Sequence, residues 1–582
     1  MIVADSRRLT GPSLLLDRPG AILEIHLDPA RVPEAAEAWR VAARRLLDAV
    51  GWNGETLATR TFATGASLAL TAPADALYAA TDLNEAAWEA AEARLAGKPG
   101  PDEAATAERL RAAIAGERDP RLAALRDAAR AHGLVFLSGE GLVSAGAGTG
   151  VAVWPADALP AAGDVDWARV HDVPVALVTG SNGKTTVVRL LAAMLSERGQ
   201  VAGATSTDGV SVGGVTIAEG DYSGPSGARL LLRRPEVEAA VLETARGGLL
   251  RRGLPVEHAD AAVVTNVADD HLGEFGIEDL RSLAEVKLLV ARAVRPDGAL
   301  VLNADDPVLR EAASAVRAPI VWFSLEAGEP AIVRHVAAGG RAAWCEDGRL
   351  VLAEGASRAA VASVAEIPLA LGGAARHNLA NALAAMGAAW SLGVSPADMG
   401  AALRRFGREN DDNLGRANVF ELGGVRVIVD FAHNPHGMAA LARMVATLLA
   451  RRRLVLLGQA GDRSDEAIRE LVRAALPLRP DRVVLKDMEH YLRGRTAGEI
   501  PAIMADELAR NGVPRDAIAR PGGELAAVRD ALAWAQPGDL LLLTVHQDRP
   551  LVLALIEALR ASGWRAGDPL AAGATAAPPG SS

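Results

Sequence analysis

The sequence predicts an α/β protein with a P-loop central domain on a mostly parallel sheet, a Rossmann-like α/β domain after it, and an α+β domain before it. Length is the first reason, because 582 residues are too many for one hydrophobic core. The second is PVALVTG, an apolar strand that runs into a glycine-containing turn and then a helix. The third is the alternation of later apolar strands with helical stretches, which favours a doubly wound sheet.

The domains are expected to follow one another along the chain. In residues 1–165 the alternating run AILEIHL precedes PEAAEAWRVAARRLLDAV, whose apolar residues recur at helical spacing. A charged helical stretch from Asp102 to His132 and short strand-like pieces complete this α+β domain. The central domain is expected over 166–412, with a β insertion at about 320–371, and the C-terminal domain over 413–566. Residues 567–582 are rich in small residues and proline and predict a disordered tail.

The composition excludes several classes of function. There are 61 Lys and Arg against 72 Asp and Glu, so a net charge of −11 argues against a protein that coats a nucleic acid. Cys345 is the single cysteine, which excludes an internal disulfide and fits a reducing compartment such as the cytoplasm. Asp5, Arg7 and Arg8 interrupt the apolar core of a secretory signal, and apolar runs fall short of the ~18 residues of a membrane span. We expect a cytoplasmic protein without nucleic acid or membrane partners.

The strongest motif is GSNGKTT, the turn between the strand and the helix. The N–H groups of such a turn and of the helix N-terminus form a cradle for phosphate. Lys184 can then reach the β- and γ-phosphates, and the Thr185 hydroxyl can bind Mg²⁺. Val178 stands where the general P-loop pattern has its first glycine, so the match is incomplete. The candidate nucleotide-binding residues of this turn are Gly180, Ser181, Asn182, Gly183, Lys184, Thr185 and Thr186.

A magnesium-bound nucleotide also needs ligands at the ends of neighbouring strands. Glu243 closes the apolar strand VEAAVLE and is a candidate metal ligand, with an ordinary surface glutamate as the alternative. His271 ends the turn ADDH after another strand, a weak signal that a solvated loop would also give. Lys287 lies in the apolar helix RSLAEVKLLVARAV, where a lysine commonly extends its ammonium to solvent.

These motifs, in this order, resemble the Mur ligase superfamily: TGSNGKTT, a strand ending in Glu, TNVADDHL, a helix lysine, LNADDP, RHNLANALAA, GRAN, DFAHNP and GQAGDR. The resemblance covers roughly Val175 to His546. Within the superfamily, GDYSGPSG, LETARGGLLRRGL, GDRSDE and YLRGRTAGE are similar to stretches of the C-terminal ligase half of the cyanophycin synthetase family. The N-terminal domain also resembles the one in that family. The ATP-grasp module that lies between the two parts there has no space in this sequence, so the resemblance implies one ATP site.

The resemblance implies a reaction and its cofactors, ATP and Mg²⁺. A substrate carboxylate attacks the γ-phosphate, an amine attacks the resulting acyl phosphate, and an amide, ADP and phosphate are released. By resemblance, Thr185 and Glu243 would hold one Mg²⁺, and His271 with Lys287 would hold a second. Lys184, His271 and Lys287 would be the catalytic residues. In many members the matching lysine is carbamylated, and the sequence leaves open whether Lys287 is.

Two further pairs of residues are placed around ATP by the resemblance. Asn378 and Asn381 resemble the family's asparagine pair on the adenine side, with helix capping as the alternative use of Asn378. Arg416 and Asp430, in GRAN and DFAHNP, resemble residues of the C-terminal domain that close over ATP. Ser223 resembles a residue on the substrate-carboxylate side of the cleft.

Four polar residues lie where open α/β sheets contact substrates. His433 and Asn434 share one turn, and Asp462 and Arg463 follow the strand RLVLLG, so all four sit at strand ends. Both pairs could instead be polar residues that shape their loops.

The resemblance alone implies the substrates: an amino acid that supplies the amine, and an acceptor that is a carboxylate or a peptide. The N-terminal domain is expected to dock an extended acceptor or to mediate assembly into a homo-oligomer. A peptidoglycan-precursor ligase, a folylpolyglutamate-type ligase and a non-catalytic ATP-binding scaffold stand as alternatives.

Overall fold

The computed structural model describes residues 2–269 and 272–570. Its contacts divide them into two compact units. The first contains the chain up to Val267, Leu272–Ala362 and Ala380–Leu403, and the second contains Ser363–Leu379 and the chain from Arg404 onward, with the short piece that follows Val267. Each helix of the described residues is too short or too polar to cross a membrane.

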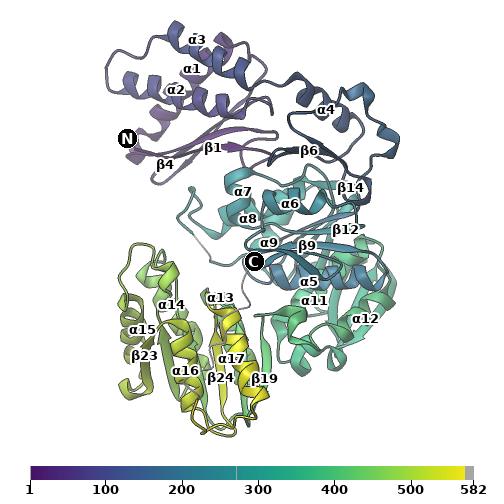
Figure 1. Ribbon diagram of the computed structural model, residues 1–582, viewed down its shortest axis with the longest axis vertical. Coiled ribbons are helices and arrows are strands. Elements are labelled where there is room, and N and C mark those ends of the chain that lie inside the picture. Colours follow the sequence, from purple (N-terminus) through teal and green to yellow (C-terminus); the bar gives the residue numbers. More distant parts are fainter. Residues whose placement is uncertain (1, 270–271, 571–582) are drawn as a thin grey trace. The chain divides into compact units, whose positions relative to one another are not determined.

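The first unit begins with a four-stranded antiparallel sheet in the order β1-β2-β4-β3. One face of this sheet packs against α1, α2 and α3 around the buried Trp39 and Trp88, and Figure 1 shows these helices together on one side of β1 and β4. The elements are β1 (Ile2–Leu9), β2 (Gly20–His26), α1 (Val32–Ala49), β3 (Leu57–Phe62), β4 (Gly65–Thr71), α2 (Leu77–Leu95) and α3 (Glu103–Glu117).

The charged stretch expected between Asp102 and His132 forms two helices, α3 and α4 (Pro120–Ala131). The break has a local cause, because Asp119 accepts the N–H groups of Arg121 and Leu122 and Pro120 occupies the first helical position. A small antiparallel sheet follows, made of β5 (Phe136–Gly139), β6 (Leu142–Ala145) and β7 (Ala152–Pro155).

An eleven-stranded sheet forms the middle of the first unit. From β9 to β16 all neighbours are parallel, and antiparallel strands lie toward both edges. In spatial order the strands are β11 (Val215–Glu219), β10 (Gly209–Val212), β9 (Ala202–Ser206), β12 (Ala239–Glu243), β8 (Val175–Thr179), β13 (Ala259–Val264), β14 (Val294–Asn303), β15 (Ile320–Ser324), β16 (Arg341–Glu346), β17 (Arg349–Glu354) and β18 (Ser357–Ser363). Residues 320–371, expected as a β insertion, thus contribute β15 to β18 to this sheet.

Helices connect the parallel strands of this sheet, as the doubly wound prediction requires. The connecting helices are α5 (Lys184–Glu197), α6 (Pro225–Leu232), α7 (Arg246–Arg252), α8 (Leu280–Lys287), α9 (Pro307–Ala312) and α10 (Pro330–Ala337). Two further helices, α11 (Arg376–Ser391) and α12 (Pro396–Arg405), follow β18. The strands at the centre are buried along their whole length, which explains why they read as unbroken apolar runs.

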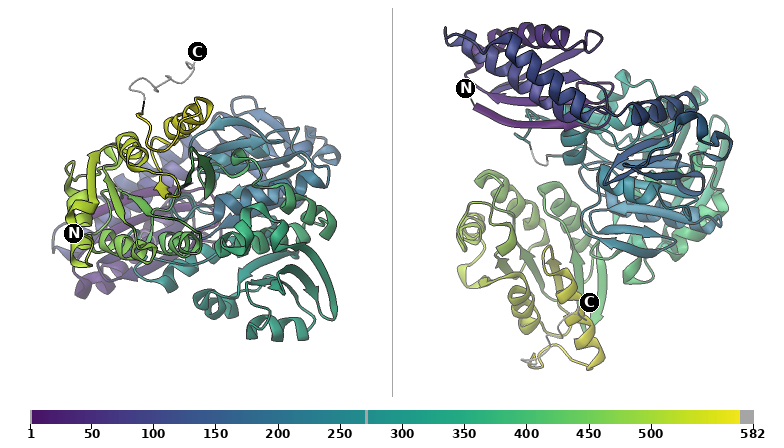
Figure 2. Two further views of the ribbon diagram at one scale, coloured as in Figure 1. Left: turned by 90° about the horizontal axis from the view of Figure 1, so that it is seen from below. Right: turned by 45° about the horizontal axis from the view of Figure 1, so that its top comes forward.

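The second unit holds a six-stranded sheet that is parallel except for β19 at one edge. Val455 and Leu457 belong to the core beneath α13, α14 and α15, and Leu454 and Leu456 belong to the core beneath α16 and α17. Figure 2 shows helices on both faces of this sheet. The strands, in spatial order, are β19 (Asn418–Leu422), β20 (Val425–Asp430), β24 (Leu540–Thr544), β21 (Arg453–Leu457), β22 (Arg482–Lys486) and β23 (Ile518–Gly522). The helices are α13 (Pro435–Ala446), α14 (Asp465–Ala475), α15 (Glu499–Arg510), α16 (Glu524–Trp534) and α17 (Arg549–Ala561).

The predicted fold class is confirmed: an α+β domain, a mostly parallel central sheet and a Rossmann-like C-terminal sheet are all present. From residue 571 onward, the expected tail lies outside the described residues.

Candidate functional site

The glycine turn lies where β8 ends and α5 begins. Gly180 and Gly183 have φ angles of +144° and +87°, a region that favours glycine. A Cβ at Gly180 would lie 1.8 Å from Thr265 Oγ1, and one at Gly183 would lie 2.2 Å from Asn381 Oδ1. Both glycines are therefore fixed by close approach as well as by backbone conformation.

The turn is held from outside by the residues after β13. Asn266 accepts hydrogen bonds from the backbone N–H groups of Ser181 and Asn182, at 2.9 and 3.0 Å. The start of α5 then supplies the N–H groups and the positive dipole end that favour an anion. The Asn266 hydrogen bonds and the start of α5 therefore place the glycine turn beside N–H groups of the kind that favour an anion.

Lys184 is the first residue of α5, and its ammonium folds over the turn. Nζ donates to the carbonyl oxygens of Gly180 and Ser181, at 3.1 and 3.2 Å. The ammonium therefore lies directly against the glycine turn.

Thr185 and Glu243 form a buried hydroxyl–carboxylate pair. Thr185 Oγ1 donates to Glu243 Oε2 at 2.8 Å, and their residues are 5% and 1% exposed. Because β12 pairs with β8 in parallel, the two strands bring Glu243 to the side of the turn. Glu243 is thus a buried residue, and the surface alternative is wrong. Oxygen ligands of this kind suit Mg²⁺, so the pair fits the proposed metal.

Lys287 ends α8 and is 2% exposed. The alternative in which its ammonium extends into solvent is therefore wrong. A charged group buried to this extent, whether an ammonium or a carbamate, needs polar or charged partners. His271, its expected partner at the metal, lies outside the described residues.

The two asparagines of α11 have different surroundings. Asn381 lies against Gly183, as noted above, and is 7% exposed. Asn378 Nδ2 donates to the carbonyl oxygen of Leu369 at 3.2 Å. Since α11 begins at Arg376, Asn378 is inside the helix, and the capping alternative is wrong.

Arg416 and Asp430 lie at the carboxyl end of β20 in the second unit. The Arg416 guanidinium stacks 4.5 Å from the centre of the Phe431 ring. The Asp430 carboxylate accepts the N–H groups of Ala417 and Ala432, at 2.8 and 2.7 Å. Burial raises the pKa of Asp430 to about 6, although Arg416 and these hydrogen bonds oppose the shift.

Three of the residues predicted to contact substrate, Asn434, His433 and Asp462, form hydrogen bonds or ion pairs within the protein. Asn434 caps α13 by accepting the N–H of Gly437 at 2.8 Å, which is the loop-shaping use. The neighbouring His433 has its carbonyl held by Gln459 Nε2 at 2.9 Å. Asp462 is ion-paired with Arg493.

The two other residues predicted to contact substrate, Arg463 and Ser223, also form hydrogen bonds within the protein. The carbonyl oxygen of Arg463 accepts from Arg495 Nη2 at 2.8 Å. Ser223 Oγ donates to Asp221 at 2.6 Å, and the Ser223 carbonyl accepts the N–H of Ala245, two residues after Glu243. Ser223 therefore lies on the Glu243 side of the sheet.

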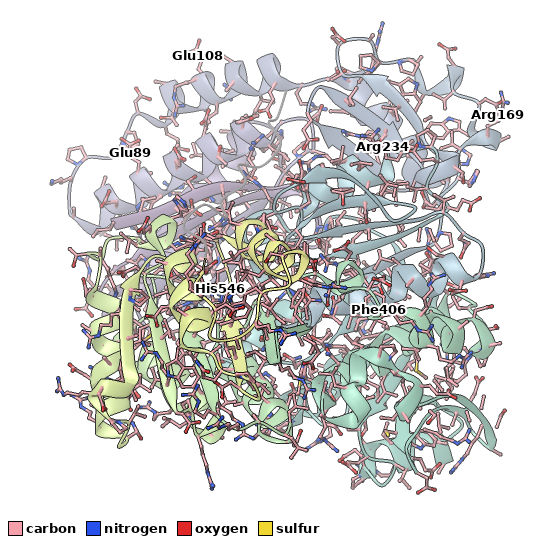
Figure 3. All side chains as sticks on the ribbon, turned by 60° about the horizontal axis from the view of Figure 1, so that its bottom comes forward. Glu89, Glu108, Arg169, Arg234, Phe406 and His546 are labelled. Atoms are coloured by element: carbon pink, nitrogen blue, oxygen red, sulfur yellow. The ribbon has the colours of Figure 1, made fainter. Side chains whose placement is uncertain are left out.

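Sequence reasoning missed a buried ionic cluster at the carboxyl edge of the C-terminal sheet. Lys486 and Glu524 form an ion pair with fully buried side chains, and Lys486 Nζ also lies 3.0 Å from His546 Nδ1. His546, labelled in Figure 3, has Nε2 3.1 Å from the carbonyl oxygen of Ala432, the residue before His433. Burial lowers the pKa of His546 well below its ordinary value, and the charge of Lys486 adds to this. A lysine ending the apolar strand RVVLK was the available signal.

Two family models match the chain: the Mur ligase middle domain over residues 178–389, and the Mur ligase glutamate ligase domain over residues 415–544. A cyanophycin synthetase of Crocosphaera subtropica is 40% identical over 334 residues, covering 57% of this chain and 38% of that relative. The UDP-N-acetylmuramate–L-alanine ligase of Xylella fastidiosa is 31% identical over 373 residues, covering 63% of this chain and 70% of that relative.

A solved structure of E. coli FolC in complex with DHPP and ADP has the same fold. The two superpose with a TM-score of 0.50 at 20% identity, over 66% of this chain and 89% of that chain. The chain thus spans most of the length of this structure, but less than two fifths of the length of the cyanophycin synthetases that it matches.

Proposed function

Because the chain belongs to the Mur ligase family, we propose that it is an ATP-dependent ligase that joins a carboxylate to an amine. The single observation that supports this best is the hydroxyl–carboxylate pair beside the glycine turn, Thr185 with Glu243. A turn that binds phosphate and an adjacent pair of oxygen ligands are what magnesium-bound ATP requires. The FolC structure was solved with ADP, which supports ATP as the nucleotide.

In the proposed site, Gly180, Ser181, Asn182, Gly183 and Thr186 surround the phosphates together with the start of α5. Asn378 and Asn381 are proposed to bind on the adenine side, and Arg416 and Asp430 are proposed nucleotide-binding residues by family resemblance. Thr185 and Glu243 would hold Mg²⁺, which supplies charge neutralisation at the phosphates when bound. His271 and Lys287 are proposed for a second Mg²⁺ on sequence grounds.

The proposed reaction has two steps. An oxygen of the acceptor carboxylate attacks the γ-phosphorus, the bond to the β-phosphate oxygen breaks, and ADP leaves. The amine nitrogen then attacks the acyl carbon, the carbon–oxygen bond to phosphate breaks, and the nitrogen loses a proton. Lys184 stabilises the negative charge of the transferring phosphoryl group, because this transfer depends mainly on positioning and charge neutralisation.

The substrates are proposed by class. The relatives named above include a cyanophycin synthetase and an L-alanine ligase, so we propose an amino acid as the amine and a carboxylate-bearing amino acid or peptide as the acceptor. Five residues are proposed to contact these substrates: Ser223, His433, Asn434, Asp462 and Arg463. We place the protein in the cytoplasm, with domain boundaries at 165, 412 and 566.

The test is phosphate release by the purified full chain with Mg²⁺ and ATP, across amino acids crossed with small acidic peptides. Mass spectrometry then examines every active mixture. A product heavier than the acceptor by one amino-acid residue supports the ligase and names its substrates. Activity with a UDP-sugar peptide as acceptor would favour a peptidoglycan-precursor ligase, and activity with a folate would favour a folylpolyglutamate-type ligase. ATP binding without turnover would favour a non-catalytic ATP-binding scaffold.

A further inference from the structure

The β1–β4 sheet and the loop after β1 contact three segments of the central domain within the same compact unit. The first is α7, which follows Glu243. The second is Leu272–Glu278, which directly follows His271. The third is the 3₁₀ helix Leu288–Arg292, which directly follows Lys287. All three segments therefore adjoin residues proposed to bind metal.

Arg7 of β1 is the centre of these contacts. Its guanidinium pairs with Asp5 at 2.6 Å and with Glu24 at 3.0 Å, both within the N-terminal sheet. Its Nε donates to the carbonyl oxygen of Leu250 in α7 at 3.1 Å. The same guanidinium lies 4.7 Å from the centre of the Phe275 ring. One side chain thus joins the sheet, α7 and the segment after His271.

The Arg7 side chain is fixed rather than mobile. Arg7 is 8% exposed and Glu24 is 4% exposed, and Ser67 Oγ donates to Glu24 at 2.6 Å. Removing two charges from water is costly, so a buried pair of this kind adds little stability by itself. The Arg7–Glu24 pair instead fixes the orientation of the Arg7 guanidinium, whose planar group holds several partners in a defined geometry.

The segment Leu272–Glu278 has a backbone that needs support. Phe275 has a φ of +54°, which is unfavourable for a bulky side chain unless the surroundings hold it. Gly276 has a φ of +66°, and a Cβ there would lie 2.4 Å from the Phe62 ring. Glu278 accepts the N–H of Ala63 at 3.1 Å. The turn between β3 and β4 therefore touches the same segment that Arg7 touches.

The chain after β1 binds the other two segments. The N–H of Thr10 donates to the carbonyl oxygen of Arg252 at 2.9 Å, at the end of α7. Arg292 Nη1 donates to the carbonyl oxygen of Ser13 at 2.7 Å. The N-terminal domain therefore contacts segments that follow three of the four proposed metal ligands, namely Glu243, His271 and Lys287.

We propose that the N-terminal domain is a positioning element for the metal side of the proposed active site, and that Arg7 is its principal positioning residue. This inference rests on the proposed function for its catalytic consequence. Arg7 holds Leu272–Glu278 between the N-terminal sheet and α7, directly before α8, which carries Lys287. The contacts of Arg7 with Leu250 and Phe275 are present in the structure whether or not the protein is a ligase.

The test compares the full-length wild type with the double variant Arg7→Gln/Glu24→Gln, which removes both charges and leaves no buried ion alone. Amide hydrogen exchange in Leu272–Glu278, recorded without substrates, is expected to rise at least about tenfold. The kcat of ligation is expected to fall at least about tenfold with the KM for ATP within about twofold, because small displacements of catalytic groups cost rate. Arg40→Gln, which removes an exposed ion pair with Glu37 in the same domain, is the control and should change neither.

A second variant tests the same contact in case the double variant does not fold. Gly276→Ala places a Cβ against Phe62, so it should raise exchange in the same segment and lower kcat. Adding Phe62→Ala removes the obstructing ring and should recover part of both. Absence of recovery would contradict the direct contact.

The outcomes separate the two proposals. Unchanged exchange in Leu272–Glu278 would overturn the inference, and raised exchange with unchanged kcat would overturn the positioning role. A wild type that makes no amide refutes the proposed function, while the exchange result still decides whether Arg7 holds the segment.

Discussion

Thr185 Oγ1 donates a hydrogen bond of 2.8 Å to Glu243 Oε2, although the two residues are 58 positions apart in the chain. The parallel pairing of β8 and β12 brings them together, with Glu243 in register with Val178 just before the turn. Both side chains are buried, so the pair is part of the rigid sheet edge rather than of a mobile loop. The proposed magnesium site depends on this relationship.

Glu243→Gln is expected to raise the Mg²⁺ concentration for half-maximal activity by at least about tenfold. The amide can still accept the Thr185 hydrogen bond, but it lacks the charge that attracts the cation. A Mg²⁺ titration of phosphate release measures this. Glu219→Gln, at an exposed position on β11 of the same sheet, is the control. Equal Mg²⁺ requirements in the wild type and Glu243→Gln would exclude Glu243 as a ligand.

Gly183→Ala is expected to weaken ATP binding at least about tenfold and to cost about 1–3 kcal/mol of stability. Its Cβ would collide with Asn381 in addition to straining a φ of +87°. Gly199→Ala is a matched control, because Gly199 has a φ of +89° with open space around it. Calorimetry of ATP binding and urea unfolding compare the two. If both variants bind ATP equally well, the turn does not hold the phosphates as proposed.

Asp430→Asn is expected to change how stability depends on pH. The folded-state pKa of about 6 lies above the ordinary value of 3.8, so the folded protein binds this proton more tightly than the unfolded chain does. The stabilising contribution is full below about pH 4 and is lost as the pH rises through 6. Between pH 5 and 7.5 the wild type should lose about 1.4 kcal/mol that Asp430→Asn does not lose.

Urea unfolding of both proteins at the two pH values measures this difference. Asp506→Asn, at an exposed position of α15, is the control variant. A constant offset of Asp430→Asn from the wild type would show that the Asp430 carboxyl does not titrate in this range.

Lys486→Met is expected to destabilise the protein by about 3–5 kcal/mol, because it leaves the Glu524 carboxylate buried without its cation. Both side chains are fully buried. The double variant Lys486→Met/Glu524→Gln should recover most of this loss, since it removes both charges. Urea unfolding of the two variants gives the comparison. A single variant no less stable than the double variant would argue that the pair is not ionised.

The elements nearest the phosphate turn could be predicted because they are contiguous. A strand, a glycine turn and a helix occupy consecutive residues, so local pattern places Lys184 and Thr185 correctly at the start of α5. Glu243 could be placed beside them because parallel strands end at one edge of a sheet. The roles of these residues in binding stay predictions.

Other features depend on tertiary packing that no local pattern reports. Lys486, Glu524 and His546 come from β22, α16 and the end of β24, and only the sheet order brings them together. In the sequence, Arg7 is only a charged residue that interrupts an apolar segment. In the structure it is a buried residue of β1 whose side chain contacts α7 and Phe275. Asn434 of DFAHNP caps α13, and its contact with substrate stays a prediction.

In the proposed reaction, the acceptor is activated by phosphoryl transfer to its carboxylate at the turn that carries Lys184. The most direct measurement uses an acceptor with ¹⁸O in both carboxylate oxygens and follows the label by mass spectrometry. One ¹⁸O is expected in each released phosphate and none in ADP, and Lys184→Ala is expected to remain folded and to form no product. Release of AMP and pyrophosphate, phosphate without label, or full activity of Lys184→Ala would contradict the proposed reaction.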